Sequence, residues 1–158
     1  MSEQQPAPNR IVADIDVLAA DLFCDGSARK SLDVIRSHSW ITLIATAALL
    51  DEAQLLIESV ASSALAADWR SRITETAHIV EPTASGHPAL VAAHTGNAAT
   101  LLTFNESLQS AQAGASLRAA VSTSIKSPEA FTLLVEPAQL YETLFGDTYP
   151  GPDTDPRG

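Results

Sequence analysis

Residues 12–23 read VADIDVLAADLF, and this stretch sets the interpretation of the whole chain. The pattern predicts a short apolar strand over Ile11–Asp16, which closes with the acids Asp14 and Asp16. A helix is predicted to follow at once, over Val17–Cys24, and to end at an Asp-Gly pair. The chain therefore opens with a buried strand whose carboxyl end carries two carboxylates.

Strands and helices alternate along the rest of the chain. The apolar runs Trp40–Ala45 and Ala98–Phe104 predict strands covered on both faces, and His78–Val80 and Ala119–Ile125 predict shorter ones. Helices are predicted to begin at Ser27, Thr46, His87, Asn105 and Ser127, and a last one to cover Pro137–Phe145. This alternation predicts an α/β fold of three layers, with four or five mostly parallel strands between two layers of helices.

Length and composition predict one domain with two flexible ends. The chain has 158 residues, of which 46% are hydrophobic, enough for one core and too few for two ordinary domains. We expect residues 1–9 to be flexible, residues 10–146 to form the domain, and residues 147–158 to form a mobile acidic tail. The end of that tail reads TYPGPDTDPRG and has no apolar periodicity.

Charge and hydropathy limit the classes of function. The formal charge is −10, which opposes tight nonspecific binding of nucleic acid, because that binding depends on basic side chains. The apolar runs are far shorter than the roughly 20 residues of a membrane-spanning helix, and the polar start does not resemble a secretory signal. We therefore expect a cytoplasmic protein with no membrane partner. Cys24 is the only cysteine and is predicted to be buried.

Polar side chains follow the predicted strands where each strand ends. Asp14 and Asp16 follow the first strand, Thr46 the second and Asn105 the third long one. Ligands of parallel sheets bind beyond the carboxyl ends of the strands, so these residues are candidates for one site. Two acids at a spacing of two on a strand point to the same side, where they could face a cation or instead accept backbone amides as a helix cap. Spacing alone leaves both interpretations open.

Four blocks of sequence, taken in order, resemble the PIN-domain family over roughly residues 10–135. They are VADIDVLAADLF at 12–23, IATAALLDEAQLLI at 44–57, GHPALVAAHTGNAATLLTFNESL at 86–108, and SPEAF at 127–131. In that family an apolar strand ends in Asp, a second strand ends in Ser or Thr with a Glu six residues later, and a third ends in Thr-x-Asp or Thr-x-Asn. The order and spacing of the blocks carry the resemblance.

The resemblance implies a ribonuclease that hydrolyses phosphodiesters of single-stranded RNA with Mg²⁺ or Mn²⁺. Matching the blocks assigns metal binding to Asp14, Asp16 and Glu52, and catalysis to Asp14, Glu52 and Asn105. Carboxylates are the ligands that these hard cations prefer. The family also includes toxins of toxin–antitoxin pairs, so an antitoxin-like protein or a second copy of the chain is an expected partner.

Two positions depart from the family pattern. Gly86 and His87 stand where the family has its third acid, and Asn105, with Glu106 beside it, stands at the fourth. The alternative hypothesis is therefore a catalytically inactive PIN-like binding or scaffold protein.

A third hypothesis is a phosphatase similar to the haloacid dehalogenases. Residues 14–18, DIDVL, also fit the DxDxV opening of that family, and Thr103 ends a strand as its second motif requires. That chemistry needs a later lysine, for which Lys126 is the candidate, and a further acidic pair, which the sequence does not place on a strand after it.

Overall fold

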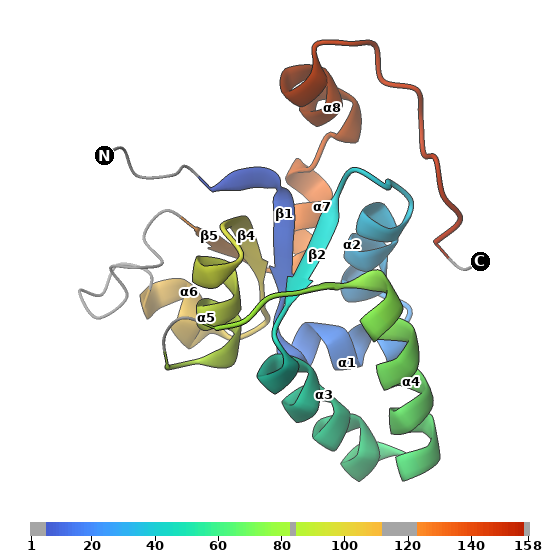
Figure 1. Cartoon of the computed structure of the whole chain (residues 1–158), viewed down its shortest axis with the longest axis vertical. Helices are drawn as coiled ribbons and strands as arrows, with labels where there is room; N and C mark the ends of the chain where they lie inside the picture. The colour runs from blue at the N-terminus through green and yellow to red at the C-terminus, as the bar shows by residue number, and fades with distance from the viewer. Residues whose placement is uncertain (1–5, 83–84, 112–122, 157–158) are drawn as a thin grey trace.

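The computed structural model of this chain describes residues 6–82, 85–111 and 123–156 (Figure 1). Within those residues it forms one five-stranded sheet, parallel throughout, in the order β3-β2-β1-β4-β5. The strands are β1 (Ala7–Ala13), β2 (Thr42–Ala45), β3 (His78–Ile79), β4 (Ala98–Leu102) and β5 (Ser124–Lys126). The predicted α/β class, with a central parallel sheet, is confirmed.

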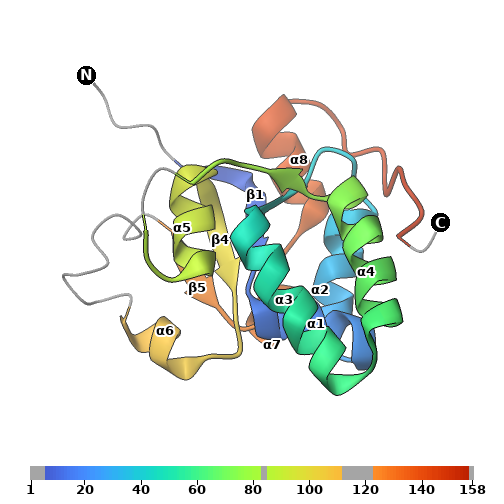
Figure 2. The ribbon, with the colours of Figure 1, turned by 60° about the horizontal axis from the view of Figure 1, so that its bottom comes forward.

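Helices cover both faces of this sheet. They are α1 (Ile15–Phe23), α2 (Ser27–Arg36), α3 (Ala47–Val60), α4 (Ser63–Thr76), α5 (Pro88–Thr95), α6 (Glu106–Ala111), α7 (Pro128–Leu134) and α8 (Pro137–Phe145). Helix α5 packs against β1, β2 and β4 on one face, with α3 beside it, whereas α2 and α7 pack together on the other (Figures 1 and 2). The result is the three-layer α/β/α arrangement that the alternating pattern predicts.

The central strands are buried because their side chains are apolar on both faces. Val12 of β1, Ile44 of β2 and Leu101 of β4 have no exposed surface. Gly96 ends α5 directly above this core, and a Cβ atom there would lie only 2.3 Å from Cγ2 of Ile44. Glycine therefore lets the end of α5 approach β2 closely enough for the chain to turn into β4.

Three predicted helix caps are confirmed. Thr46 caps α3 by accepting from the amide of Leu49, and Ser127 caps α7 in the same way. His87 caps α5 through Nδ1, which accepts from the amide of Ala89. These caps follow from local chemistry, because the side chain and the amide it binds lie within three residues of one another.

Two local predictions at the start of the chain are wrong. The first strand ends at Ala13, and Asp16 lies in the first turn of α1 and not on a strand. Cys24, predicted to be buried, is exposed at the end of α1. By contrast, α2 begins at Ser27 as predicted, with Gly26 at its cap position and no side-chain hydrogen bond there.

Both ends of the chain are more ordered than their composition predicts. Strand β1 starts at Ala7, which pairs with Ala98, inside the segment predicted to be flexible. In the tail, Tyr149 contacts His38, and the amides of Asp153 and Thr154 donate to the carbonyl of Ser37.

Some predictions lie outside the described residues. These are the flexibility of residues 1–5 and 157–158 and the start of the last predicted strand at Ala119. Among the residues that the structure does describe, no helix is both long and apolar enough to span a membrane.

Candidate functional site

The candidate site lies where β1 and β4 end side by side. After β1 the chain passes to β2, which pairs with one edge of β1. Later it returns to β4, which pairs with the opposite edge of β1. At such a reversal the chain connections diverge and leave a crevice beyond the carboxyl ends of the two strands. Asp14 directly follows β1, and Thr103 directly follows β4.

Asp14 is buried and held by both strands. Its side chain retains 5% exposure, its amide donates to the carbonyl of Leu102 over 2.9 Å, and its Oδ1 caps α1 by accepting from the amide of Ile15 at 2.8 Å. Oδ2 accepts from Oγ1 of Thr103 at 2.9 Å. Each oxygen thus accepts from one neutral donor, and no basic side chain of the described residues forms an ion pair with Asp14.

Asp16 lies beside Asp14 with one oxygen unsatisfied. Its Oδ2 accepts from the amide of Phe104 at 3.1 Å, whereas Oδ1 is buried and has no hydrogen-bond partner among the described residues. Burial raises the pKa of Asp16, and the charge of Asp14 raises it further. The carboxylate form of Asp16 is therefore less favoured than in water, and a positive charge at Oδ1 would stabilise it.

Asn105 is engaged in local structure. Its side-chain Oδ1 accepts from the backbone amides of Ser107 and Leu108 and so caps the start of α6. The backbone amide of Asn105 donates to Oγ1 of Thr103 at 3.0 Å. Asn105 is exposed. It would have to weaken these capping bonds in order to bind a metal through Oδ1.

Glu52, His87 and Glu106 do not complete a cluster of three metal-binding side chains with the two aspartates among the described residues. Glu52 lies on an exposed face of α3 and makes no ion pair within 4.0 Å in the described residues. His87 is occupied as the cap of α5, and Glu106 is exposed in the first turn of α6. The structure thus brings together Asp14, Asp16 and Thr103, with Asn105 at the edge.

A family model described as a family of unknown function, DUF7384, matches residues 5–157. The chain belongs to this family. No curated protein and no solved structure matches the chain. The matched range of the DUF7384 family includes most of both segments that composition predicts to be flexible, which agrees with the ordered contacts of Ala7 and Tyr149.

The donor set of this DUF7384 domain suits a hard cation that keeps most of its water. Within residues 6–82, 85–111 and 123–156, no group of three His, Cys, Asp or Glu side chains is arranged to hold a metal ion. Mg²⁺, however, usually binds through one or two carboxylates and completes its shell with water and substrate phosphate. Asp14 and Asp16 supply two carboxylates, and Oδ1 of Asp16, which has no partner among the described residues, is the oxygen open to such an ion.

Thr103 belongs to the Thr-x-Asn pattern of the nuclease hypothesis, which gave it no role at the site. It is completely buried and connects Asp14 to the backbone after β4. Its sequence signal is a hydroxyl at the end of an apolar run, where a buried polar group must find a partner.

Proposed function

We propose that this chain is a PIN-like, divalent-metal-dependent ribonuclease domain that hydrolyses phosphodiesters of single-stranded RNA. The observation that supports this most is the buried Oδ1 of Asp16, which has no partner among the described residues and lies next to the charge of Asp14, beyond the carboxyl ends of β1 and β4. Two carboxylates that repel one another inside a fold are the usual sign of a group that a cation stabilises.

In this proposal the two aspartates hold Mg²⁺ or Mn²⁺, and their neighbours keep them in place. Thr103 fixes Asp14 and the amide of Phe104 fixes Asp16, so neither carboxylate needs to reorganise when a cation arrives. A bound ion would supply an activated water and stabilise the charge that develops on the phosphate.

Glu52 and Asn105 have more distant parts in this proposal. Six residues of α-helix separate Glu52 from Thr46, which is about 9 Å along the axis of α3. We assign Glu52 to contacts with water around the ion and Asn105 to the substrate side of the site, where it is exposed. Both residues would modulate cleavage less than the two aspartates.

Charge makes the proposed RNA binding dependent on metal. The chain carries −10, so without a cation its surface repels the phosphate backbone. The charge therefore predicts weak binding of RNA in the absence of metal.

We include in the proposal a cytoplasmic location and an antitoxin-like protein or a second copy of the chain as partner.

A catalytically inactive binding module is the second candidate. It is favoured by the capping role of Asp14 and by the lack of a third acid beside the pair in the described residues. The phosphatase hypothesis is weaker, because the Lys126 side chain lines a different pocket with Thr100 and Phe131. Among the described residues, Lys126 makes no ion pair within 4.0 Å.

Cleavage of a fluorescent single-stranded RNA with Mn²⁺ or Mg²⁺ tests the proposal. The wild-type chain should cleave, EDTA should stop it, and Asp14→Asn and Asp16→Asn should each lower the rate by at least about a hundredfold. The control is Asp25→Asn, an exposed acid between α1 and α2, which should cleave like the wild type.

The other outcomes separate the candidate functions. Metal binding without cleavage would favour the inactive module. Hydrolysis of p-nitrophenyl phosphate that Asp14→Asn abolishes would favour the phosphatase.

A further inference from the structure

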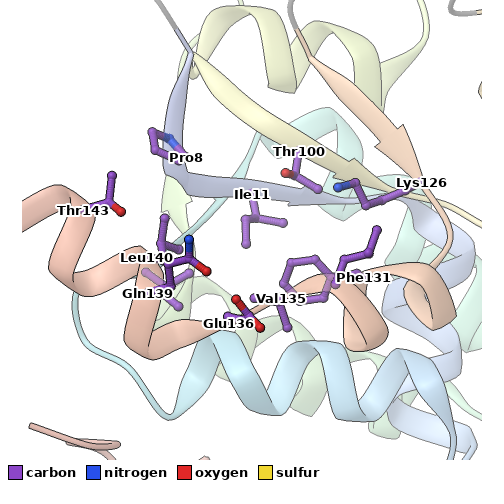
Figure 3. Close-up of a pocket in the computed structure, with 12 residues that line it drawn as sticks. Pro8, Ile11, Thr100, Lys126, Phe131, Val135, Glu136, Gln139, Leu140 and Thr143 are labelled. Carbon is purple, nitrogen blue, oxygen red and sulfur yellow. The ribbon is translucent and has the colours of Figure 1, made fainter. Parts of the chain in front are cut away.

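A pocket of about 350 Å³ lies on the side of the sheet covered by α7, away from the β1–β4 crevice (Figure 3). Its floor is formed by β1, β4 and β5, and its far wall by the end of α7, the start of α8 and the link between them. The volume falls at the lower end of the range for small-molecule sites, roughly 300–1,000 Å³. It is large enough for a small organic ligand.

The walls of this pocket are mostly apolar. They are formed by Ile11, Ile41, Phe131, Leu134, Val135 and Leu140. Helix α8 forms part of the wall, although none of its residues is buried. Tyr141 and Phe145 of this helix pack edge-on against Trp40, with ring centroids 5.3 Å and 5.9 Å away. This aromatic cluster holds α8 in place beside the sheet and leaves the space between them open.

One cation stands among these apolar walls. Lys126, the last residue of β5, lies across the floor next to Thr100 of β4, opposite Gln139 of α8 (Figure 3). Glu136 also lines the pocket, yet no carboxylate in the described residues lies within 4.0 Å of the Lys126 ammonium group. An unpaired cation beside apolar surface is the complement of an anionic head on an apolar body.

The larger cleft of about 700 Å³ between α1, α2 and α4 does not offer this combination. Arg36 there is already paired with Asp21 and Asp33, and Arg29 donates to the carbonyls of Asp21 and Leu22. A ligand anion there would have to compete with two carboxylates of the protein. The pocket at Lys126 requires no such displacement.

We propose that the pocket between the sheet and α7–α8 binds a small amphipathic anion, a carboxylate with an apolar chain or ring. Lys126 binds the carboxylate, with Thr100 beside it, and the apolar walls take up the chain. This inference does not depend on the nuclease proposal, because the pocket shares neither Asp14 nor Asp16 with the metal site.

A titration of the full chain with sodium octanoate, followed by ¹H–¹⁵N NMR, tests this site. Octan-1-ol is the matched neutral probe, since it keeps the chain and lacks the charge. Octanoate should shift the amide signals of Thr100, Lys126 and Leu140 first. Lys126→Met, which keeps the apolar stem, should raise the Kd for octanoate about tenfold and leave that for octan-1-ol unchanged. Lys30→Met, an exposed lysine on α2, should behave like the wild type for both probes.

Three results would overturn the proposal. They are no shifts at these amides with millimolar octanoate, shifts centred elsewhere, or equal binding of octanoate by Lys126→Met and the wild type. Should Lys126→Met fail to fold, the wild-type preference decides the matter: octanoate must bind at least about fivefold more tightly than octan-1-ol, and a smaller preference contradicts the role of Lys126. Leu140→Trp, which fills the pocket, should abolish binding of both probes.

Discussion

The hydroxyl of Thr103 donates a hydrogen bond to Oδ2 of Asp14 over 2.9 Å, and so joins the residue after β4 to the residue after β1. Both side chains are buried. The same hydroxyl oxygen accepts from the amide of Asn105, which in turn caps α6. One side chain therefore orders both strand ends at the candidate site.

Replacing this hydroxyl should destabilise the fold. Thr103→Val keeps the shape but leaves a buried carboxylate oxygen and the amide of Asn105 without their partner, so the free energy of unfolding should fall by about 1–3 kcal/mol. Thr103→Ser keeps the hydroxyl and should lose less. Urea unfolding of the three proteins measures both effects. Equal stability of Thr103→Val and wild type would show that the bond is not formed in solution.

The raised pKa of Asp16 predicts a pH dependence of stability in metal-free buffer. Asp16 binds a proton more readily in the folded chain than in the unfolded chain, where its carboxyl has the ordinary pKa of 3.8. This contribution to stability is complete below that value and is lost as pH rises through the folded pKa. Asp16→Asn should thus be more stable than the wild type at pH 7, and the advantage should shrink at pH 3.

Chemical denaturation at a series of pH values measures this difference. The amide side chain that Asp16→Asn introduces would still present an oxygen to the amide of Phe104, so the substitution removes the charge and keeps the hydrogen bond. Asp25→Asn is the control, and its difference from wild type should not change with pH in this way. A wild-type chain that is more stable than Asp16→Asn at pH 7 without metal would rule out the repulsion.

The local caps could be predicted from sequence, but the division between strand and helix at Asp14 could not. Residues 13–16 alternate apolar and acidic side chains after the apolar pair Ile11 and Val12, a pattern that a strand and a strand-to-helix junction share. The strand stops at Ala13 because Asp14 accepts from the amide of Ile15 and starts α1. Asp16 consequently approaches Asp14 from a helical turn.

Glu52 shows why matching a spacing does not place a side chain. Six residues at about 100° per residue put Glu52 about 240° around α3 from Thr46. Which face of α3 points toward the site depends on how the helix packs. Ala53 and Ile57 are among the residues on its buried face. Sequence spacing alone gives no information on that rotation.

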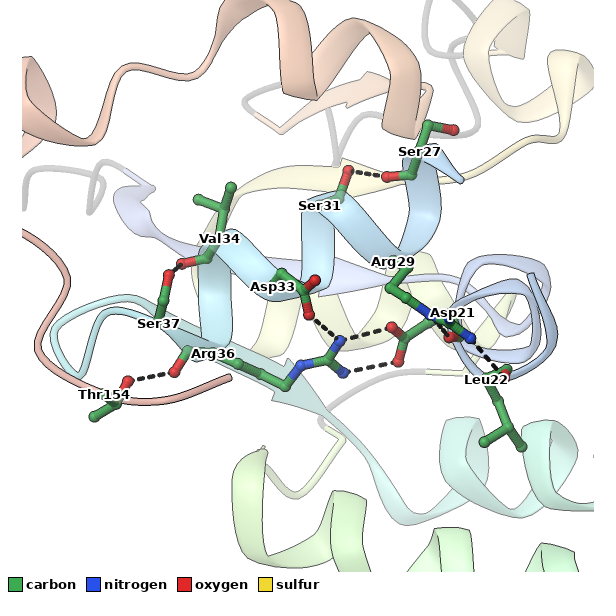
Figure 4. A network of polar contacts seen from close by, with 10 residues as sticks. All are labelled: Asp21, Leu22, Ser27, Arg29, Ser31, Asp33, Val34, Arg36, Ser37 and Thr154. Atoms are coloured by element: carbon green, nitrogen blue, oxygen red, sulfur yellow. Dashed lines mark hydrogen bonds and ion pairs between the residues drawn. The ribbon is translucent and has the colours of Figure 1, made fainter. Parts of the chain in front are cut away.

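The ion pairs of Arg36 (Figure 4) predict that replacing Arg36 lowers the free energy of unfolding much more than replacing the exposed Arg72. Nη1 and Nη2 of Arg36 lie 2.8 Å and 2.7 Å from the two oxygens of Asp21, whose side chain is only 9% exposed. Arg36→Met leaves that carboxylate buried without a cation and should lower the free energy of unfolding by about 3 kcal/mol.

Arg72→Met provides the matched control. Arg72 pairs with Asp68 at 3.2 Å, but the two side chains are 79% and 57% exposed. Water screens such a pair, so thermal or urea unfolding should show a change below about 0.5 kcal/mol. Similar losses for both variants would contradict the assigned burial of Asp21.

The contact between Tyr149 and His38 predicts that the tail contributes to stability. The carbonyl of Val34 can only accept, so Nδ1 of the neutral His38 ring carries the hydrogen and Nε2 accepts from the Tyr149 hydroxyl at 2.6 Å. Tyr149→Phe should cost about 1 kcal/mol and speed amide exchange at Asp153 and Thr154. Rapid exchange of both amides in the wild type would instead indicate an undocked tail.

Composition could not reveal this docking. Proline, glycine and acidic residues predict a segment without a core of its own, which holds for residues 147–156. The bonds that order the segment go to Arg36, Ser37, His38 and Ser39, more than 100 residues earlier in the chain. Only the folded arrangement brings these groups together.

Titration with Mn²⁺, followed by ¹H–¹⁵N NMR, tests the proposed metal site most directly. The paramagnetic ion should broaden the amide signals of Asp16 and Phe104 first, at millimolar concentration or below, and Asp16→Asn should remove this selective broadening while Asp25→Asn retains it. Unchanged Asp16 and Phe104 signals at millimolar Mn²⁺ in a folded wild-type chain would contradict the account.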